Sequence, residues 1–311
     1  MTAMERQVEG CLKKMRSLNF SPYTIRNSRF ILRRFVEWLA EAGVHAPEKL
    51  RSRHLGNWQD ALAARMNGDR PLKARSVNKK VEVVRGFLKY LTKEGLIPAV
   101  LVERVQYVKQ PYLLPGSVLT HVQARQLLDA VATDTAEGYR NRTMLELLYS
   151  SGIRSGELLG LNVMDIELTG RTAVVMGKGR KQRVVPYGVS AARYLETYIR
   201  VIRPHFLYDA AETALFLNGP GNRLPYHTLR RLIHAYSEAA GLDVTVTPHT
   251  FRRSCTTEML RSGANMYHVK ELLGHESLDT LKHYARLTIT DLKRTHRRCH
   301  PMERDGHGDH I

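Results

Sequence analysis

The chain has 311 residues, which suggests two domains. Its formal net charge of +18 and sequence pI near 10 favour a polyanionic partner, either nucleic acid or an anionic membrane surface, and at this charge density DNA or RNA binding is favoured over a chain that is merely basic and soluble. Hydrophobic residues make up 43%, as in ordinary soluble globular proteins. No apolar run reaches the roughly 18 to 20 residues of a membrane span, and residues 1–9 hold no apolar signal core. Cys11, Cys255 and Cys299 are odd in number and far apart, which argues against a disulfide or zinc framework and predicts reduced thiols in a cytoplasmic protein.

Residues 1–108 are predicted to form a helical domain. The apolar spacing indicates helices over 8–18, 23–41 and 55–62, with Ser21 as the N-cap of the second. A fourth helix shows the clearest apolar stripe: Val77, Val81, Val84, Leu88 and Leu91. Its other face is polar and basic: Arg75, Asn78, Lys79 and Arg85.

Residues 109–118 hold two prolines and a glycine and are predicted to be a linker. Helical spacing resumes over 122–131 and 139–149. Two strands, 172–176 and 182–186, flank a Gly-Lys-Gly turn and predict a small antiparallel element. Further helices are expected over 190–203, 225–240, 249–261, 266–273 and 278–286. The predicted fold class is therefore mainly α, with a small antiparallel β-sheet in the C-terminal domain.

Six residues of the C-terminal domain could together hold and attack a phosphodiester. In chain order they are Arg154, Lys178, His249, Arg252, His275 and Tyr284. Arginine, lysine and histidine supply hydrogen-bond donors for a pentavalent phosphate, and a tyrosine hydroxyl can form a covalent phosphate ester. Each residue alone is more often structural, and a free phenol, with its pKa of about 10, is a poor nucleophile. The order and the local context of all six together indicate a catalytic set.

This order and spacing resemble the catalytic domain of the tyrosine recombinases, the phage integrase and Xer-type family, over about residues 119–290. The matching motifs are Gly152-Ile153-Arg154-Ser155-Gly156-Glu157, Gly177-Lys178-Gly179, His249-Thr250-Phe251-Arg252, Leu273-Gly274-His275 and, nine residues later, Tyr284. Three residues depart from the commonest pattern without removing a catalytic group: Ile153, Phe251 and Arg253. The resemblance implies a helical core-binding domain at 1–108, the linker at 109–118, an α+β catalytic domain at 119–290 and a C-terminal tail at 291–311.

Charge stabilisation and proton removal are expected from four of these side chains. Arg154 and Arg252 can each offer paired donors to the nonbridging phosphate oxygens, which lysine does less well. His275 is the expected further donor. His249 is placed to act as general base on the hydroxyl of Tyr284.

The resemblance implies that Tyr284 becomes joined to the 3′ phosphate and frees a 5′ hydroxyl. The leaving oxygen needs a proton, and Lys178 is the expected acid because it occupies the Gly-Lys-Gly position of the family. Lys181 is the competing lysine. Glu157 is expected to orient an arginine or to cap its helix.

No cofactor and no metal are expected. The phosphotyrosine ester retains the energy of the phosphodiester, so rejoining needs no ATP, and arginine takes the place of a metal's charge. The C-terminal tail carries histidines without a cysteine pattern, and we expect a mobile tail there and not a metal site: His296, His300, His307 and His310.

The implied partner is double-stranded DNA with paired inverted-repeat half-sites. The basic helix face is expected to contact DNA, mostly at phosphates, through Arg75, Asn78, Lys79 and Arg85. The resemblance also implies strand exchange through a Holliday junction in a homotetramer, with a second recombinase as a further option. Residues 287–311 are long enough to connect subunits.

Two other functions stay open from the sequence alone. One is a DNA-binding regulator or architectural protein of the same fold without catalysis, and the other is a type IB topoisomerase-like relaxing activity. The biological process is equally open between integration or excision of a mobile element and resolution of chromosome or plasmid dimers. In each case the expected location is the cytoplasm, at the nucleoid.

Overall fold

The computed structural model describes residues 2–67, 70–109, 118–177, 179 and 181–274. The chain divides into two compact units, Met1–Leu113 and Leu114–Ile311. The helix expected over 278–286 and the tail lie outside the described residues. In the part of the chain that the structure describes, no helix is long and apolar enough to span a bilayer.

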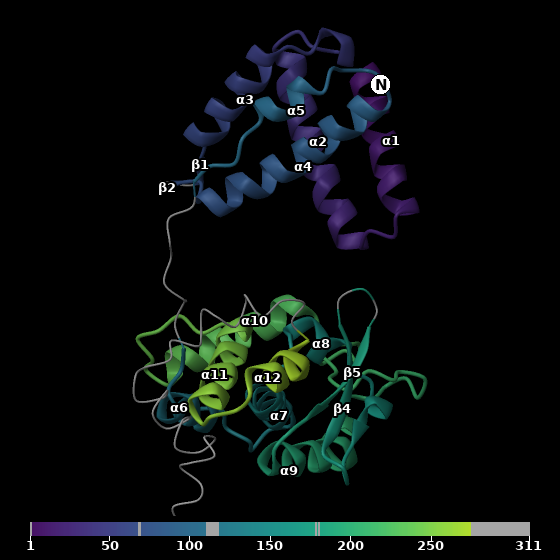
Figure 1. Cartoon of the computed structure of the whole chain (residues 1–311). Helices are drawn as coiled ribbons and strands as arrows, with labels where there is room; N and C mark the ends of the chain where they lie inside the picture. Colours follow the sequence, from purple (N-terminus) through teal and green to yellow (C-terminus); the bar gives the residue numbers. More distant parts are fainter. Residues whose placement is uncertain (1, 68–69, 110–117, 178, 180, 275–311) are drawn as a thin grey trace, which may run out of the picture. The chain divides into compact units, whose positions relative to one another are not determined.

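The N-terminal unit is built from helices (Figure 1). They are α1 (Ala3–Ser17), α2 (Pro22–Glu41), α3 (Ser52–Ala64), α4 (Ala74–Lys93) and α5 (Val100–Arg104), with a 3₁₀ turn at Pro47–Lys49. A short antiparallel pair, β1 (Met66–Asn67) and β2 (Arg70–Pro71), joins α3 to α4. Four of the helices were predicted. The pair of strands and α5 were not, because segments of two and five residues are too short to show a period.

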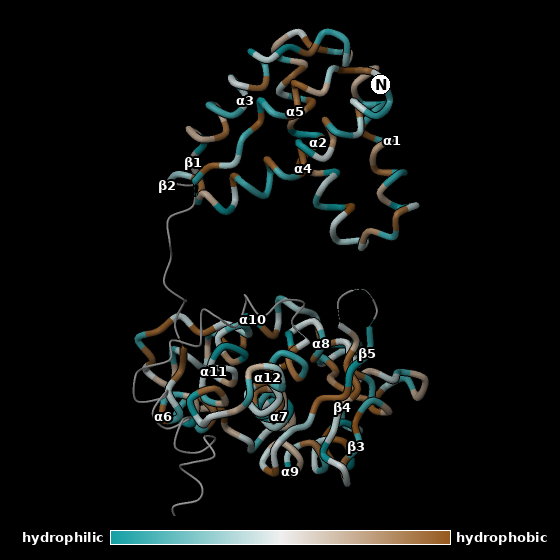
Figure 2. Tube along the Cα trace, in the orientation of Figure 1, coloured by the Kyte–Doolittle hydropathy of each residue, from teal (hydrophilic) through white to brown (hydrophobic). Residues whose placement is uncertain are grey.

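Local signals in the sequence fix the helix starts and the buried faces of this unit. The side chain of Ser21 accepts a hydrogen bond from the backbone N–H of Thr24 at 3.1 Å, and Pro22 follows at the first helical position. The apolar stripe predicted for α4 is buried. Hydrophobic and hydrophilic residues alternate along α2 and α4 in Figure 2, as expected for helices with one buried face.

The C-terminal unit combines helices with one small sheet. Its helices are α6 (His121–Asp129), α7 (Ala136–Ser151), α8 (Ser155–Gly160), α9 (Val189–Thr197), α10 (Tyr226–Ala239), α11 (Pro248–Arg261) and α12 (Met266–Leu273). The sheet is antiparallel in the order β3 (Ile166–Glu167), β4 (Thr172–Met176), β5 (Gln182–Pro186), with Val174 opposite Val184. A mainly helical fold with a small antiparallel sheet confirms the predicted fold class. The helix expected over 190–203 instead changes after Thr197 into a π turn and a 3₁₀ turn.

Helix α7 is the centre of this unit, because residues all around it are buried. It ends at Gly152, whose φ of 63° is a left-handed conformation that suits glycine. Helix α12 ends in the same way at Gly274, with a φ of 62°. The carbonyl ends of these two helices supply the acceptors around which the candidate site is built.

Candidate active site

Arg154 and Arg252 both bind carbonyl oxygens at the ends of α7 and α12. Arg252, on α11, is 7% exposed and donates from Nη1 to Gly152 O at 2.8 Å and from Nη2 to Leu273 O at 2.6 Å. Arg154 is the N-cap residue of α8 and donates from Nη2 to Gly274 O at 3.0 Å. Residues about a hundred positions apart in the sequence are thus brought to one place.

Two guanidinium groups at helix C-termini form a favourable electrostatic arrangement, because those ends carry partial negative charge. Burial, and then the neighbouring charge of Arg154, lower the pKa of Arg252 to about 10. Arg252 therefore remains protonated at neutral pH. The side chain of Arg154 is 35% exposed, so it can meet an anion from solvent.

Glu157 holds Arg154 in place through two hydrogen bonds. Its Oε1 accepts from Nη1 of Arg154 at 2.7 Å, and its Oε2 accepts from the backbone N–H of Arg154 at 2.8 Å, which caps α8. Its side chain is 4% exposed. Burial alone would raise the pKa of Glu157, but hydrogen bonds from Arg183 and Arg154 outweigh it and bring the pKa to about 2. The carboxylate is therefore ionised at neutral pH, and it orients Arg154.

Arg183 was not predicted as part of this site. It lies on β5, and its Nη1 and Nη2 donate to the two oxygens of Glu157, each at 2.8 Å, while its Nε donates to Leu272 O at 3.0 Å. One signal was present in the sequence. Strand alternation places Arg183 on the same face as the buried Val185, where an arginine needs an acidic partner.

The remaining predicted residues are only partly described. His249 lies in the first turn of α11, exposed, three residues before Arg252. Lys178, His275 and Tyr284 lie outside the described residues. The exposed Lys181, the competing acid, accepts a hydrogen bond at its backbone oxygen from Gly177 N at 2.8 Å, which closes the base of the β4–β5 turn.

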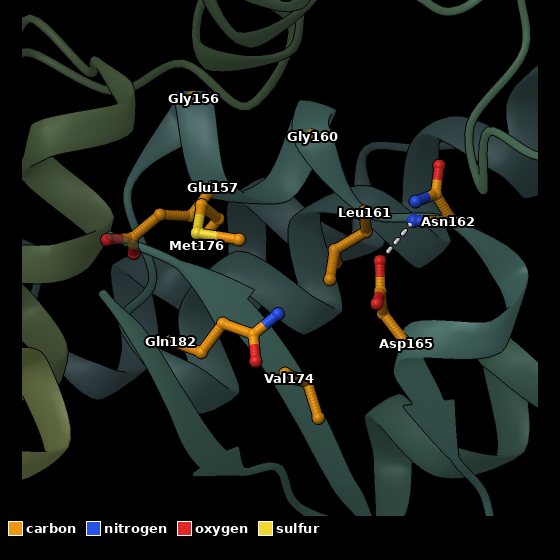
Figure 3. Close-up of a pocket in the computed structure, with 9 residues that line it drawn as sticks. All are labelled: Gly156, Glu157, Gly160, Leu161, Asn162, Asp165, Val174, Met176 and Gln182. Atoms are coloured by element: carbon orange, nitrogen blue, oxygen red, sulfur yellow. Dashed lines mark hydrogen bonds between the residues drawn. The ribbon is translucent and has the colours of Figure 1, made fainter. Parts of the chain in front are cut away.

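A pocket of about 200 Å³ lies beside Glu157, between α8 and the strands β4 and β5. Figure 3 shows Glu157 and Met176 on one side of it and Asn162 and Asp165 on the other. The Asp165 carboxylate accepts from the backbone N–H of Asn162 at 2.8 Å. Because the charged residues lining the pocket are the carboxylates Glu157 and Asp165, it does not suit a phosphate.

Two of the four residues predicted to face DNA hold a neighbouring segment of the chain. The side-chain amide of Asn78 makes two hydrogen bonds of 2.8 Å with the backbone N–H and C=O of Val108. Nη1 of Arg85 donates to Val102 O at 3.0 Å and also to Val105 O.

Arg75 and Lys79 are both exposed on α4, and Lys79 lies 3.2 Å from Glu82. A role of these four side chains at DNA remains a prediction. Across the described ranges, which leave out the C-terminal histidines, no group of three or more His, Cys, Asp or Glu could hold a metal ion.

Comparison with protein families matches both units. A model described as the phage integrase family matches residues 117–290, and a model of the phage integrase N-terminal SAM-like domain matches residues 12–95. Tyrosine recombinase XerC of Myxococcus xanthus is 34% identical over 291 residues, which is 90% of this chain and 92% of the relative. Tyrosine recombinase XerD of a Staphylococcus epidermidis strain is 35% identical over 231 residues, which is 73% of this chain and 77% of the relative.

Among solved structures, the fold is similar to that of the XerH site-specific recombinase bound to a palindromic difH substrate in a post-cleavage complex. The TM-score is 0.70 at 22% identity, with 95% of this chain and 84% of that chain covered. The XerC and XerD relatives, both tyrosine recombinases, support strand exchange over the regulatory and topoisomerase-like alternatives.

Proposed function

This chain belongs to the phage integrase family of tyrosine site-specific recombinases, and we propose that Tyr284 is its nucleophile. The phenolic oxygen attacks a DNA phosphorus atom and becomes joined to the 3′ phosphate, while the bond to the 5′ oxygen breaks. The observation that carries this proposal is that Arg154 and Arg252 both bind carbonyl oxygens at the C-terminal ends of α7 and α12. In the sequence, Arg154 follows Gly152 by two positions and His275 follows Gly274 directly.

The two arginines supply charge where the pentavalent phosphate develops it. Each donor aimed at such an oxygen is worth roughly 3 to 4 kcal/mol of transition-state stabilisation. Arg154 is held by Glu157 and Gly274, so its orientation is set before DNA arrives. His275 follows Gly274 directly in the sequence and is the proposed third donor.

Two proton transfers complete the cleavage step. His249 takes the proton of the Tyr284 hydroxyl as general base, helped by its place on the same helix as Arg252. Lys178 gives a proton to the 5′ oxygen as it leaves, with Lys181 as the alternative acid. In the return reaction the 5′ hydroxyl of a partner strand attacks the phosphotyrosine, and the protons move back.

We further propose that the enzyme acts without a cofactor or metal. The phosphodiester energy is kept in the protein–DNA ester, so ligation needs no ATP. Positive charge comes from protein side chains, with Arg154 and Arg252 as the principal groups.

The proposed substrate is double-stranded DNA with inverted-repeat half-sites, bound by a homotetramer that exchanges strands through a Holliday junction. Similarity to the tyrosine recombinases XerC and XerD supports recombination as the reaction, and the process that we propose is resolution of chromosome or plasmid dimers in the cytoplasm, at the nucleoid. A second recombinase that assembles with this chain is a further proposed partner. Integration or excision of a mobile element is the competing process. The tail at 291–311 is the proposed connector between subunits.

A nicked duplex carrying the recombination site tests the proposed chemistry. Cleavage near the nick releases a short fragment, which prevents religation and traps the covalent complex. We expect a trapped complex in EDTA, with a 5′ hydroxyl that polynucleotide kinase can label and a 3′ end blocked by protein. A free 3′ end, or a strict need for magnesium in the cleavage step, would contradict the mechanism.

A further inference from the structure

One guanidinium, that of Arg183, connects three elements around the site. Its two terminal nitrogens donate to the carboxylate of Glu157 on α8, each at 2.8 Å, and its Nε donates to Leu272 O in α12 at 3.0 Å. The side chain is 15% exposed. Because β5 carries Arg183, this side chain fixes the sheet to both helices.

Two glycines pack against the same guanidinium. A Cβ atom added to Gly177 would lie 3.4 Å from Nη1 of Arg183, and one added to Gly274 would lie 3.1 Å from both Nε and Nη1. Gly177 also donates its N–H to Lys181 O at 2.8 Å, at the base of the β4–β5 turn. The residue after each glycine belongs to the predicted catalytic set.

Arg154 makes three hydrogen bonds of its own, in which Arg183 is not a partner. It contacts Glu157 through both its side chain and its backbone N–H, and it reaches Gly274 O. Gly177 lies against Arg183 itself: a Cβ atom added to Gly177 would lie 3.4 Å from Nη1 of Arg183, which binds Glu157 of α8, and 3.8 Å from Oε1 of Glu157. Loss of Arg183 should therefore disturb the turn more than it disturbs Arg154.

We infer that Arg183 is a positioning residue that holds Gly177 and the base of the β4–β5 turn beside Glu157, and that the proton transfer assigned to Lys178, the next residue in the sequence, depends on it. This inference rests on the proposed function. A general acid must come within about 2.6 to 3.2 Å of the leaving oxygen, and a displacement of 1 Å can lower a rate by about 10²-fold. A guanidinium packed on Gly177 supplies the rigidity that this placement requires.

The test compares two nicked substrates, one with ordinary DNA and one with sulfur in place of the 5′ bridging oxygen. A thiolate leaves without a proton, so the sulfur substrate does not need the acid. For Arg183→Met we expect cleavage of ordinary DNA to fall by about 10²-fold. On the sulfur substrate it should stay within about fivefold of the wild-type protein, as expected where general-acid catalysis is no longer needed. Arg183→Lys keeps the charge but not the fork of donors, and should show the same pattern more weakly.

Arg142→Met is the matched structural control. Arg142 makes a comparable pair with the buried Glu146, at 3.0 Å, and its side chain is 12% exposed. We expect this variant to cleave both substrates like the wild-type protein, per folded molecule. Thermal unfolding and half-site binding measure the folded fraction of every variant.

Lys178→Ala, assayed in parallel, distinguishes a failure of the positioning role of Arg183 from a failure of the assignment of Lys178 as the acid. If Lys178→Ala is rescued by sulfur and Arg183→Met is not, the positioning role is wrong and the proposed function stands. If Lys178→Ala is itself not rescued, the assignment of the acid is wrong, and the inference falls with it. Equal losses of Arg183→Met on both substrates, or no loss on ordinary DNA, would also overturn the inference.

Discussion

Arg252 and Leu273 are joined by a hydrogen bond of 2.6 Å from the guanidinium Nη2 to the carbonyl oxygen. The other terminal nitrogen of Arg252 binds Gly152 O at 2.8 Å. One buried cation on α11 therefore satisfies acceptors at the C-terminal ends of both α12 and α7. Arg252, the proposed phosphate-binding residue, therefore also joins these two helix ends through its hydrogen bonds.

Arg252→Lys separates charge from geometry. An ammonium cannot reach two carbonyls and a phosphate in the planar arrangement of a guanidinium, so we expect trapped cleavage to fall by about 10²-fold or more. Arg252→Ala should in addition lower the free energy of unfolding by about 3 kcal/mol, because two buried acceptors lose their donor. Urea denaturation and the nicked-duplex assay measure the two effects. Arg261→Lys, at the exposed end of the same helix, is the control; cleavage by Arg252→Lys at the wild-type rate would refute the role.

Glu157 gives the protein a specific dependence of stability on pH. Its folded pKa of about 2 lies below the ordinary value of 4.5, so its stabilisation is complete above pH 4.5 and is lost as the pH falls towards 2. The shift corresponds to about 3 kcal/mol. The unfolding free energies of the wild-type protein and Glu157→Gln should therefore converge by about that amount between pH 5 and pH 2. Parallel profiles would contradict the buried ion pair, and Glu196→Gln, in an exposed pair, should leave the profile unchanged.

The sequence was sufficient to predict the helix that carries Arg252, because helix periodicity is a local signal. Arg154 was found through a family motif, while the six-residue helix α8 that begins after it was not predicted as an element. The contacts made by Arg183 could not be predicted in the same way. Its partners Glu157 and Leu272 are 26 and 89 positions away, and nothing in β5 alone says which acidic residue it meets. Period-2 alternation could have marked Arg183 as an inward-facing arginine, but it does not identify the partner.

The same limitation applies to the polar face of α4. Helical periodicity places Asn78 and Arg85 opposite the apolar stripe, but it does not distinguish a side chain that faces solvent from one that holds a returning segment. Both hold backbone groups of the stretch after α4. That stretch contains α5, whose five residues carry too little pattern to predict.

The predicted DNA contacts of Arg75 and Lys79 can be tested by measuring DNA binding of their alanine variants, with Asn78→Ala as the uncharged comparison. If the two cations neutralise phosphates, Arg75→Ala and Lys79→Ala should weaken half-site binding for all sequences and each reduce the salt slope by about 1. Asn78→Ala removes no charge and should leave the slope unchanged, while hydrogen exchange at Val108 N–H becomes faster because its acceptor is lost. Fluorescence anisotropy at several salt concentrations gives the slopes. A wild-type slope for both cation variants would remove them from the DNA interface.

Truncation after Thr288 tests the proposed connector between subunits. The N-terminal unit is intact in this variant, so binding to a single half-site should change little. Cooperative filling of paired half-sites should fall, and recombination should be lost, because a cyclic assembly needs a contact between neighbours. Gel shifts on half-site and full-site DNA measure both steps. If the truncated protein fills paired sites cooperatively and recombines, the tail is not the connector.

The covalent bond between Tyr284 and DNA is the most direct test of the whole account. Wild-type protein and Tyr284→Phe are incubated with the nicked duplex, resolved under denaturing conditions, and the DNA-linked peptide is identified by mass spectrometry. Tyr267→Phe, which changes an exposed tyrosine of α12, is the matched control. We predict an adduct on the peptide containing Tyr284 in the wild-type protein and in Tyr267→Phe, and none in Tyr284→Phe although it still binds the site. An adduct that persists in Tyr284→Phe, or that maps to another residue, would contradict the central claim.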